Sequence, residues 1–174
     1  MIGEPEMEQN SKSQNSEPVR IFLHGLESSN NGVKAVFFRK HFSDMIVPSF
    51  TGDLLTRMEK LREILVGKSD ITMVGSSFGG LMASIFAMEN PSLVNKLILL
   101  APAIHIIKNA PATIRSISTP VQIYHGDKDE VIPLPEVEGI ARELFQNLSF
   151  YIVQDDHSLH ETFKTMDWKA LLSS

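Results

Sequence analysis

The chain has 174 residues, 43% of them hydrophobic and 21% charged, which suits one globular domain with a sizeable core. Its formal net charge of -5 and the lack of any lysine or arginine cluster argue against a nucleic-acid partner. Cysteine is absent, which excludes disulfides, thiolate metal sites and a cysteine nucleophile.

The beginning of the chain differs in composition from the rest. Residues 1–18 are rich in Glu, Gln, Asn and Ser and lack the basic-then-apolar pattern of a secretion signal, so we expect a disordered tail there. Residues 19–174 are expected to form a single domain. Because no apolar run approaches the length needed to cross a bilayer, we expect a cytoplasmic protein with no membrane partner. The sequence does not predict the oligomeric state.

From residue 19 onward, short apolar runs alternate with segments of helical periodicity. Strands are predicted at residues 19–24, 45–47, 71–74, 95–101, 121–124 and 148–153. Helices are predicted at about residues 33–42, 54–66, 81–88, 111–117, 135–145 and 159–172. Such alternation favours a parallel sheet covered on both faces, because right-handed crossovers place the helices there. The expected fold is therefore α/β: a three-layer α/β/α sandwich around a mostly parallel sheet of about six strands.

Local signals mark the starts of several of these helices. Asp53 is expected to cap the second helix, and Pro135 suits a first helical position. Ser158, followed three residues later by Glu161, forms a capping-box pattern that predicts a helix from Leu159. The first helix is expected to bury an apolar face made by Val33, Val36, Phe37 and Phe38.

The strongest motif is Gly75-Ser76-Ser77-Phe78-Gly79, a G-x-S-x-G pattern between an apolar strand and an apolar helix. A serine on such a sharp turn has crowded backbone neighbours, which favours glycine two positions before it and two positions after it. Ser77 is therefore the candidate nucleophile. The alternative is a glycine-rich turn without chemistry, but the strand-turn-helix context favours a nucleophile elbow.

Residues that could activate a serine follow two later strands. Residues 125–133 carry three carboxylates and come after the fifth predicted strand, and His157 follows the last one. A serine hydroxyl becomes an effective nucleophile when an imidazole takes its proton and a carboxylate orients that imidazole. Because the carboxyl ends of parallel strands meet at one edge of the sheet, these residues are expected to lie together. Taken singly, an aspartate in a glycine turn usually shapes that turn, and a histidine before a helix is usually a surface or capping residue.

Together these segments resemble the α/β-hydrolase superfamily, and the resemblance runs from residue 19 to the C-terminus. The loop His24-Gly25-Leu26 resembles the oxyanion loop of that superfamily, and residues 75–79 resemble its nucleophile elbow. The chain order Ser, Asp, His is also the order of that superfamily. The segment at residues 24–29, with Lys34-Ala35 downstream, is similar to the YqiA-like group of small bacterial esterases.

The resemblance also selects between neighbouring acids and histidines. Residues 125–133 resemble the H-G-x-x-D-x-V-x-P acid turn, which implies that Asp129 is the acid and that Asp127 is a neighbour outside the pattern. His157 falls where the histidine of the superfamily follows the last strand. His160 is expected inside the final helix, where its side chain leans on the first turn.

The resemblance implies a serine hydrolase that needs no cofactor. Ser77 would attack the acyl carbon, His157 would transfer the proton and Asp129 would orient His157. The amides of Leu26 and Phe78 would bind the oxyanion. Supporting roles in the elbow and loops are expected for Gly25, Gly75, Gly79, His24 and His125. No metal is expected, because no His/Asp pair shows the helical spacing of metal ligands.

The expected substrate is a small-molecule acyl ester or thioester. Only residues 102–119 separate the fourth and fifth predicted strands, too few for a large cap domain, so we expect an open site and best turnover of short acyl esters. Ile104, Ile106 and Ile107 either contact the substrate or pin this segment to the core. The alternatives are hydrolysis of an amide or carbon-carbon bond on the same residues, or a non-catalytic binding protein with this fold.

Overall fold

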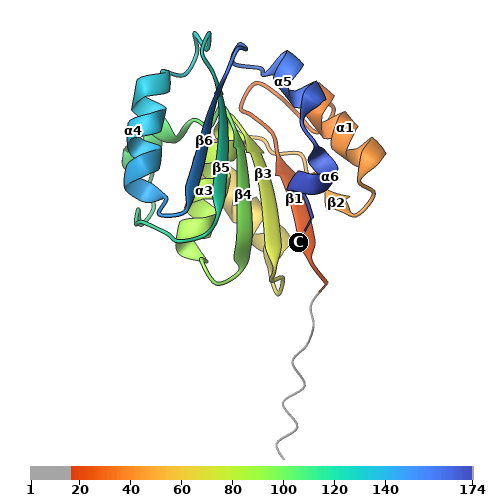
Figure 1. Cartoon of the computed structure of the whole chain (residues 1–174). Helices are drawn as coiled ribbons and strands as arrows, with labels where there is room; N and C mark the ends of the chain where they lie inside the picture. The colour runs from red at the N-terminus through yellow and green to blue at the C-terminus, as the bar shows by residue number, and fades with distance from the viewer. Residues whose placement is uncertain (1–16, 174) are drawn as a thin grey trace, which may run out of the picture.

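The structure, a computed structural model, describes residues 17–173. The expected tail at residues 1–18 therefore lies almost wholly outside the described residues. The fold is built on a six-stranded sheet in the order β2-β1-β3-β4-β5-β6, in which every neighbouring pair is parallel (Figure 1). The strands are β1 (Val19–Leu23), β2 (Met45–Ile46), β3 (Ile71–Ser76), β4 (Val94–Leu100), β5 (Val121–Gly126) and β6 (Leu148–Val153).

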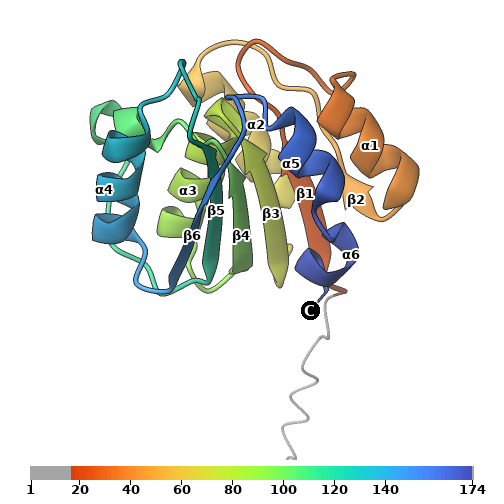
Figure 2. The same cartoon turned by 45° about the horizontal axis from the view of Figure 1, so that its top comes forward.

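Helices cover both faces of this sheet, as Figures 1 and 2 show. The helices are α1 (Val33–His41), α2 (Leu54–Leu65), α3 (Phe78–Glu89), α4 (Leu134–Leu144), α5 (His160–Thr165) and α6 (Trp168–Leu171), with a 3-10 helix η1 (Ile104–Asn109). Helices α2, α3 and α4 share one buried apolar cluster, and α1, α5 and α6 share another. The predicted three-layer sandwich without a large cap is confirmed.

The two clusters explain why the central strands are largely apolar. Successive side chains of a strand point to opposite faces, so Ile21 and Leu23 of β1 join one cluster while Phe22 joins the other. Helix α3 is buried at every position in residues 79–88, which accounts for its apolar character on all sides. The residue that precedes α3, Ser77, is thereby attached to the most extensively buried helix among the described residues. Among the described helices, none has both the length and the apolar character needed to span a membrane.

The predicted helix at residues 111–117 is wrong. The helical turn lies earlier, in η1, where Ile104 and Ile107 are fully buried on one face because a 3-10 helix repeats every three residues. Ile117 is extended instead and forms a parallel bridge with Phe145. This pairing requires extended backbone, which a helix at residues 111–117 cannot supply.

The predicted long C-terminal helix is also wrong, because it is divided into α5 and α6. The carboxylate of Asp155 accepts hydrogen bonds from the amides of Glu161 and Thr162, at 3.0 and 2.8 Å, so Asp155 and not Ser158 caps α5. Asp167 then starts α6 by accepting a hydrogen bond from the Ala170 amide at 3.0 Å. Both short helices pack through their aromatic side chains, Phe163 and Trp168, into the cluster shared with α1.

Two smaller predictions about helices need correction. Helix α1 buries Ala35 and Phe38, whereas Val33 is 78% exposed and Val36 is also exposed. Pro135 is the second residue of α4 and not the first. Helix α1 lies beside the edge strand β2 and packs against α5 through the contact of Phe38 with Phe163.

Candidate active site

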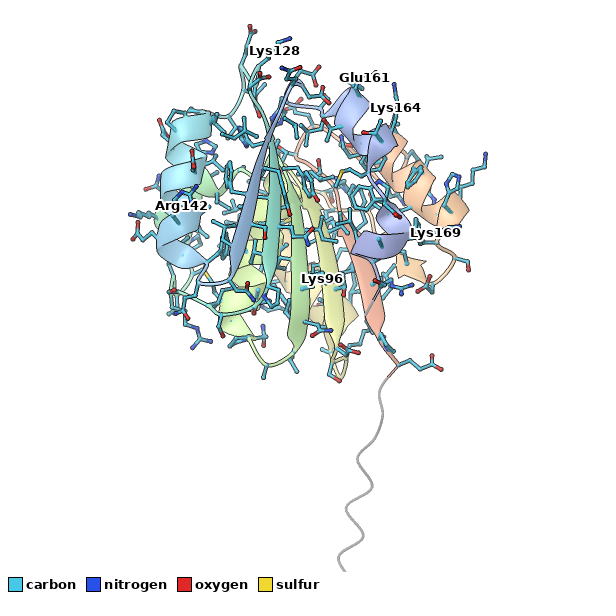
Figure 3. All side chains as sticks on the ribbon, viewed as in Figure 1. Lys96, Lys128, Arg142, Glu161, Lys164 and Lys169 are labelled. Carbon is cyan, nitrogen blue, oxygen red and sulfur yellow. The ribbon has the colours of Figure 1, made fainter. Side chains whose placement is uncertain are left out.

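The loops that follow β1, β3, β5 and β6 meet at the carboxyl edge of the sheet, the upper edge in Figure 2. Figure 3 shows Lys128, in the loop after β5, and Glu161, near the start of α5, at this same edge. The chain brings chemically capable residues from distant positions together here, as expected for a parallel sheet.

Ser77 occupies a strained turn between β3 and α3. Its backbone has φ 54° and ψ -116°, a conformation that side-chain-bearing residues rarely adopt. The turn is held by a hydrogen bond from the Ser77 amide to the Leu100 carbonyl at 2.9 Å. A Cβ added at Gly79 would lie only 2.0 Å from the Leu23 carbonyl oxygen, and one added at Gly75 would lie 2.6 Å from the Gly79 carbonyl oxygen. Glycine at both positions is therefore required for the close contact between the turn and the sheet.

The side chains of Ser77, His157 and Asp129 form one continuous chain of contacts. His157 Nε2 lies 3.1 Å from Ser77 Oγ, and His157 Nδ1 lies 2.8 Å from Asp129 Oδ2. The Asp129 side chain is fully buried, whereas the His157 side chain is 22% exposed. With a proton on Nδ1 donated to the carboxylate, neutral His157 presents an unprotonated Nε2 to the serine hydroxyl.

The turn after β5 fixes the carboxylate of Asp129. Asp129 Oδ1 accepts hydrogen bonds from the amides of Val131 and Ile132, at 2.9 and 2.8 Å. The second oxygen is shared, because His125 Nε2 lies 3.3 Å from Asp129 Oδ2 and 3.1 Å from the Ile132 carbonyl oxygen. Burial lowers the pKa of His125, which favours a neutral imidazole beside the carboxylate.

Asp127 and His160, the neighbours of Asp129 and His157 in the sequence, lie outside this chain of contacts. Asp127 is exposed. The His160 side chain is 62% exposed, and its Nδ1 lies 3.4 Å from Asp156 Oδ2. Neither residue contacts Ser77 or Asp129 through any hydrogen bond among residues 17–173.

The loop after β1 lies directly against Ser77. A Cβ added at Gly25 would be 3.4 Å from Ser77 Cβ. The buried imidazole of His24 holds the loop by accepting a hydrogen bond from the Phe50 amide at 2.9 Å and donating one to the Gly25 carbonyl at 2.8 Å. Burial also lowers the pKa of His24, in agreement with this neutral, accepting role. Among residues 17–173, the amides of Leu26 and Phe78 have no hydrogen-bond partner.

Arg57 of α2 is a component of the site that the sequence analysis missed. It is 3% exposed and donates hydrogen bonds to the carbonyl oxygens of Gly52, Gly25 and Leu26, at 3.0, 3.5 and 3.4 Å. The sequence does contain a sign of this burial. Arg57 lies three residues after Leu54 and four before Leu61, so a charged residue occupies the apolar face of the helix. Arg57 has no carboxylate partner among residues 17–173, which is rare enough for a buried arginine to indicate a local function.

A cavity of about 630 Å³ opens onto Ser77 and His157. Its apolar walls include Leu26, Val33, Val131 and Phe163. None of the three candidate isoleucines lines it: Ile104 and Ile107 are buried in the core, which favours the core-packing alternative. His105, between them, lines the cavity instead. Within residues 17–173, no group of three His, Asp or Glu side chains is arranged to hold a metal ion.

Comparison with known proteins identifies the fold. A family model described as the alpha/beta hydrolase fold matches residues 48–115. Comparison with curated protein sequences gives no significant match. A candidate hydrolase of the α/β superfamily from Xanthomonas campestris pv. campestris has 24% sequence identity and a TM-score of 0.72, with 86% of this chain and 92% of that chain covered.

Two further solved structures also resemble this chain in fold. Alpha/beta hydrolase domain-containing protein 10 from mouse has 20% identity and a TM-score of 0.69, with 85% of each chain covered. An esterase from Pyrococcus furiosus has 16% identity and a TM-score of 0.63, with 91% of this chain and 81% of that chain covered. The chain therefore has the α/β-hydrolase fold, which confirms the predicted resemblance at that level. The closer similarity to the YqiA-like group stays a prediction.

Proposed function

We propose that this protein is a serine hydrolase that cleaves carboxylic esters or thioesters through an acyl-enzyme intermediate. The observation that carries the proposal is the unbroken contact from Asp129 through His157 to Ser77, at 2.8 and 3.1 Å. These three residue types in this order of contact can activate a hydroxyl group at neutral pH. The esterase from Pyrococcus furiosus, which shares the fold, gives further support.

In the proposed reaction, His157 Nε2 takes the proton of Ser77 Oγ while the oxygen attacks the acyl carbon. The ester or thioester bond then breaks, and His157 returns the proton to the departing alcohol or thiol. In the second half, His157 takes a proton from water, whose oxygen attacks the acyl carbon. The bond from that carbon to Ser77 Oγ then breaks, and His157 returns the proton to Oγ as the carboxylic acid leaves. Asp129 keeps the proton on His157 Nδ1 and stabilises the positive charge of His157 in both halves.

The proposed oxyanion site consists of the amides of Leu26 and Phe78. Both are free of partners among the described residues, and both belong to segments that adjoin Ser77. The Phe78 amide is also at the N-terminus of α3, where the helix dipole favours negative charge. Two such donors stabilise the tetrahedral intermediate more strongly than the planar ester, which is the requirement for catalysis.

We propose short acyl esters as the best substrates. Residues 102–119 contribute only η1 and an extended segment. Ile104 and Ile107 of η1 are buried in the core, and Ile106 is exposed and does not line the cavity, so these isoleucines build no acyl tunnel. Each further methylene adds about 0.8 kcal/mol only while it is buried. Selectivity is therefore expected to stop rising within a few carbons.

The test combines a covalent probe with a substrate series. A fluorophosphonate should label wild-type protein at Ser77, as located by peptide mass spectrometry, and nitrophenyl and coenzyme A esters from acetyl to palmitoyl should give kcat/KM values that level off early. Labelling without turnover of any ester would favour the amide or carbon-carbon alternative. Neither labelling nor turnover would indicate a non-catalytic binding protein. A steady rise to palmitoyl would contradict the short-acyl proposal alone.

A further inference from the structure

Lys34, the second residue of α1, lines the cavity that contains Ser77 and His157. Lys34 Nζ donates a hydrogen bond to the Ser158 carbonyl oxygen at 2.6 Å and lies 5.6 Å from the ring centroid of Phe163. Because Ser158 directly follows His157, this cation is held on the His157 side of the cavity. Lys34 is distant in sequence from Ser158 and Phe163, and its side chain reaches them from α1.

The ammonium of Lys34 retains unused hydrogen-bonding capacity. An ammonium group has three N–H donors, and among residues 17–173 one of them has a partner. Burial lowers the pKa of Lys34, and the carboxylates of Asp156 and Asp155 oppose that shift without forming an ion pair with it. Lysine side chains usually extend to keep the ammonium in water, because burying an unpaired cation costs free energy. The two free donors are thus available to a molecule bound in the cavity.

Lys34 has no ion-pair partner among residues 17–173, although Asp155 and Asp156 lie near enough to act on its charge. Lys164 lines the same cavity but pairs with Glu161 at 2.8 Å. Glu27 is the one carboxylate-bearing residue among the described residues that line the cavity. With Lys164 paired to Glu161, Lys34 and Glu27 are the remaining lysine and carboxylate side chains among the described residues that line the cavity. An anion bound beside Lys34 would gain a charge-assisted hydrogen bond from the ammonium group.

We propose that Lys34 forms a binding subsite for an anionic group, a carboxylate or a phosphate, on the leaving-group part of the substrate. In the proposed reaction, His157 returns its proton to the leaving group. Lys34 is hydrogen-bonded to Ser158, the residue after His157, so His157 and Lys34 would face the same part of the substrate. This inference rests on the proposed hydrolase function. It makes Lys34 a specificity-determining residue and assigns it no part in bond cleavage.

Matched acetate esters test the proposal. The substrates are 4-acetoxybenzoate, its neutral methyl ester, and 4-acetoxyphenyl phosphate, each assayed with wild type, Lys34→Met and Lys34→Arg. Lys34→Met should lower kcat/KM for the two anionic esters by about tenfold or more beyond any loss on the methyl ester, chiefly through KM, as expected for one charge-assisted hydrogen bond. Each comparison is a ratio of variant to wild type on one ester, so the intrinsic reactivities of the esters cancel. The lower of the two anionic ratios shows whether phosphate or carboxylate depends more on Lys34.

The matched control is Lys40→Met, which removes an exposed lysine of the same helix that does not line the cavity. It should leave the preference for anionic esters unchanged, and Lys34→Arg should keep part of that preference. Equal losses on all three esters in Lys34→Met would mean that Lys34 only holds the Ser158 carbonyl, and the subsite would be refuted. A preference lost equally in Lys40→Met would also refute it, because the effect would then come from overall charge.

A binding experiment separates failure of the subsite from failure of the proposed hydrolase. If wild type hydrolyses no ester and Ser77 is not labelled, the hydrolase proposal fails, and the subsite is judged by calorimetric titration with 4-hydroxybenzoate. Binding that is about tenfold weaker in Lys34→Met, with no such change for methyl 4-hydroxybenzoate, would keep the subsite. Equal affinity of wild type and Lys34→Met for 4-hydroxybenzoate would overturn it.

Discussion

The guanidinium carbon of Arg57 lies 5.4 Å from the ring centroid of Phe78, while its nitrogens bind the carbonyl oxygens of Gly25 and Leu26. One buried cation therefore joins the two segments that hold the proposed oxyanion amides. Arg57→Met should lower kcat by about tenfold to a hundredfold with little change in KM, because misplaced amides weaken binding of the transition state more than binding of the ester. Steady-state kinetics on one short nitrophenyl ester measures both constants.

Two variants make the Arg57 prediction specific. Arg57→Lys keeps the charge but cannot bridge several carbonyls, so an intermediate kcat is expected. Lys60→Met, one turn further along α2, removes a cation that binds the Ser49 carbonyl at 2.7 Å and should have no effect on kcat. An unchanged kcat in Arg57→Met, with the thermal midpoint preserved, would assign Arg57 to packing alone.

Ser77 and Ser76 are adjacent serines at the cavity, and only one of them is placed to react. Ser77→Ala should abolish both ester turnover and fluorophosphonate labelling while leaving the circular dichroism spectrum unchanged, because Ser77 Oγ is the atom that faces His157. Ser76→Ala should keep appreciable activity. If both substitutions removed activity to the same extent, the assignment of the nucleophile to Ser77 would fail.

The strained backbone of Ser77 predicts an inverse relation between stability and activity at this residue. At φ 54° and ψ -116°, glycine avoids a steric cost that alanine retains. The inactive Ser77→Gly variant should therefore exceed Ser77→Ala in free energy of unfolding by about 1 kcal/mol. Urea denaturation of the two variants measures the difference, and an alanine variant of equal or greater stability would contradict this prediction.

His157 and Asp129 are each tested against a close neighbour. His157→Ala and Asp129→Asn should lower kcat by about 10³-fold or more, because the serine then lacks a correctly oriented base. His160→Ala and Asp127→Asn should retain most activity, since both side chains lie outside the contact chain. Progress curves on a nitrophenyl ester compare the four variants, and loss of activity in His160→Ala with survival in His157→Ala would reverse the assignment.

Asp155 is predicted to stabilise the fold in a pH-dependent way. Burial alone would raise the pKa of Asp155, but hydrogen bonds from Thr162, Asp156 and Glu161 lower it below the ordinary value of 3.8. Folding therefore favours the ionised carboxylate, so its stabilisation is complete above about pH 3.8 and is lost as the pH falls through the lower value of the folded state. Asp155→Ala should cost about 1–2 kcal/mol at pH 7, the usual contribution of a helix cap.

Urea unfolding of wild type and Asp155→Ala at pH 7 and pH 3 measures this contribution. The difference between them should shrink at the lower pH. Ser158→Ala serves as the control, because Ser158 was the capping residue expected from the sequence and its side chain does not cap α5. A larger loss in Ser158→Ala than in Asp155→Ala would contradict the observed cap.

The central strands of the sheet were predictable because they are buried on both faces, unlike the edge strand β6. A strand such as β4 is then apolar at most positions and appears in the sequence as a run of apolar residues. Ser77, Asp129 and His157 were predictable for a related reason: parallel strands end at one edge, so chain order alone places the residues that follow them together. These inferences depend on local patterns and on a general rule of topology.

The errors occurred where long-range contacts decide the local structure. The extended conformation of Ile117 depends on pairing with Phe145, which no local pattern indicates. The cap of α5 comes from Asp155, six residues before Glu161. Ser158 is nearer and fits the sequence pattern of a capping box, but its side chain does not cap the helix. Arg57 was overlooked because its role comes from carbonyl groups more than 30 residues away in sequence, which are visible only once the loop after β1 has packed against α2.

Lys96 fixes the end of the described chain, since its Nζ donates hydrogen bonds to the carbonyl oxygens of Leu171 and Ser173 at 3.0 and 2.9 Å. Lys96 lies near the start of β4, so the final helix ends at the amino edge of the sheet, where β1 also begins (Figure 1). The cavity at Ser77 opens at the other edge. A fluorescent label, a purification tag or a solid support joined through either described end would therefore leave the cavity facing the solution.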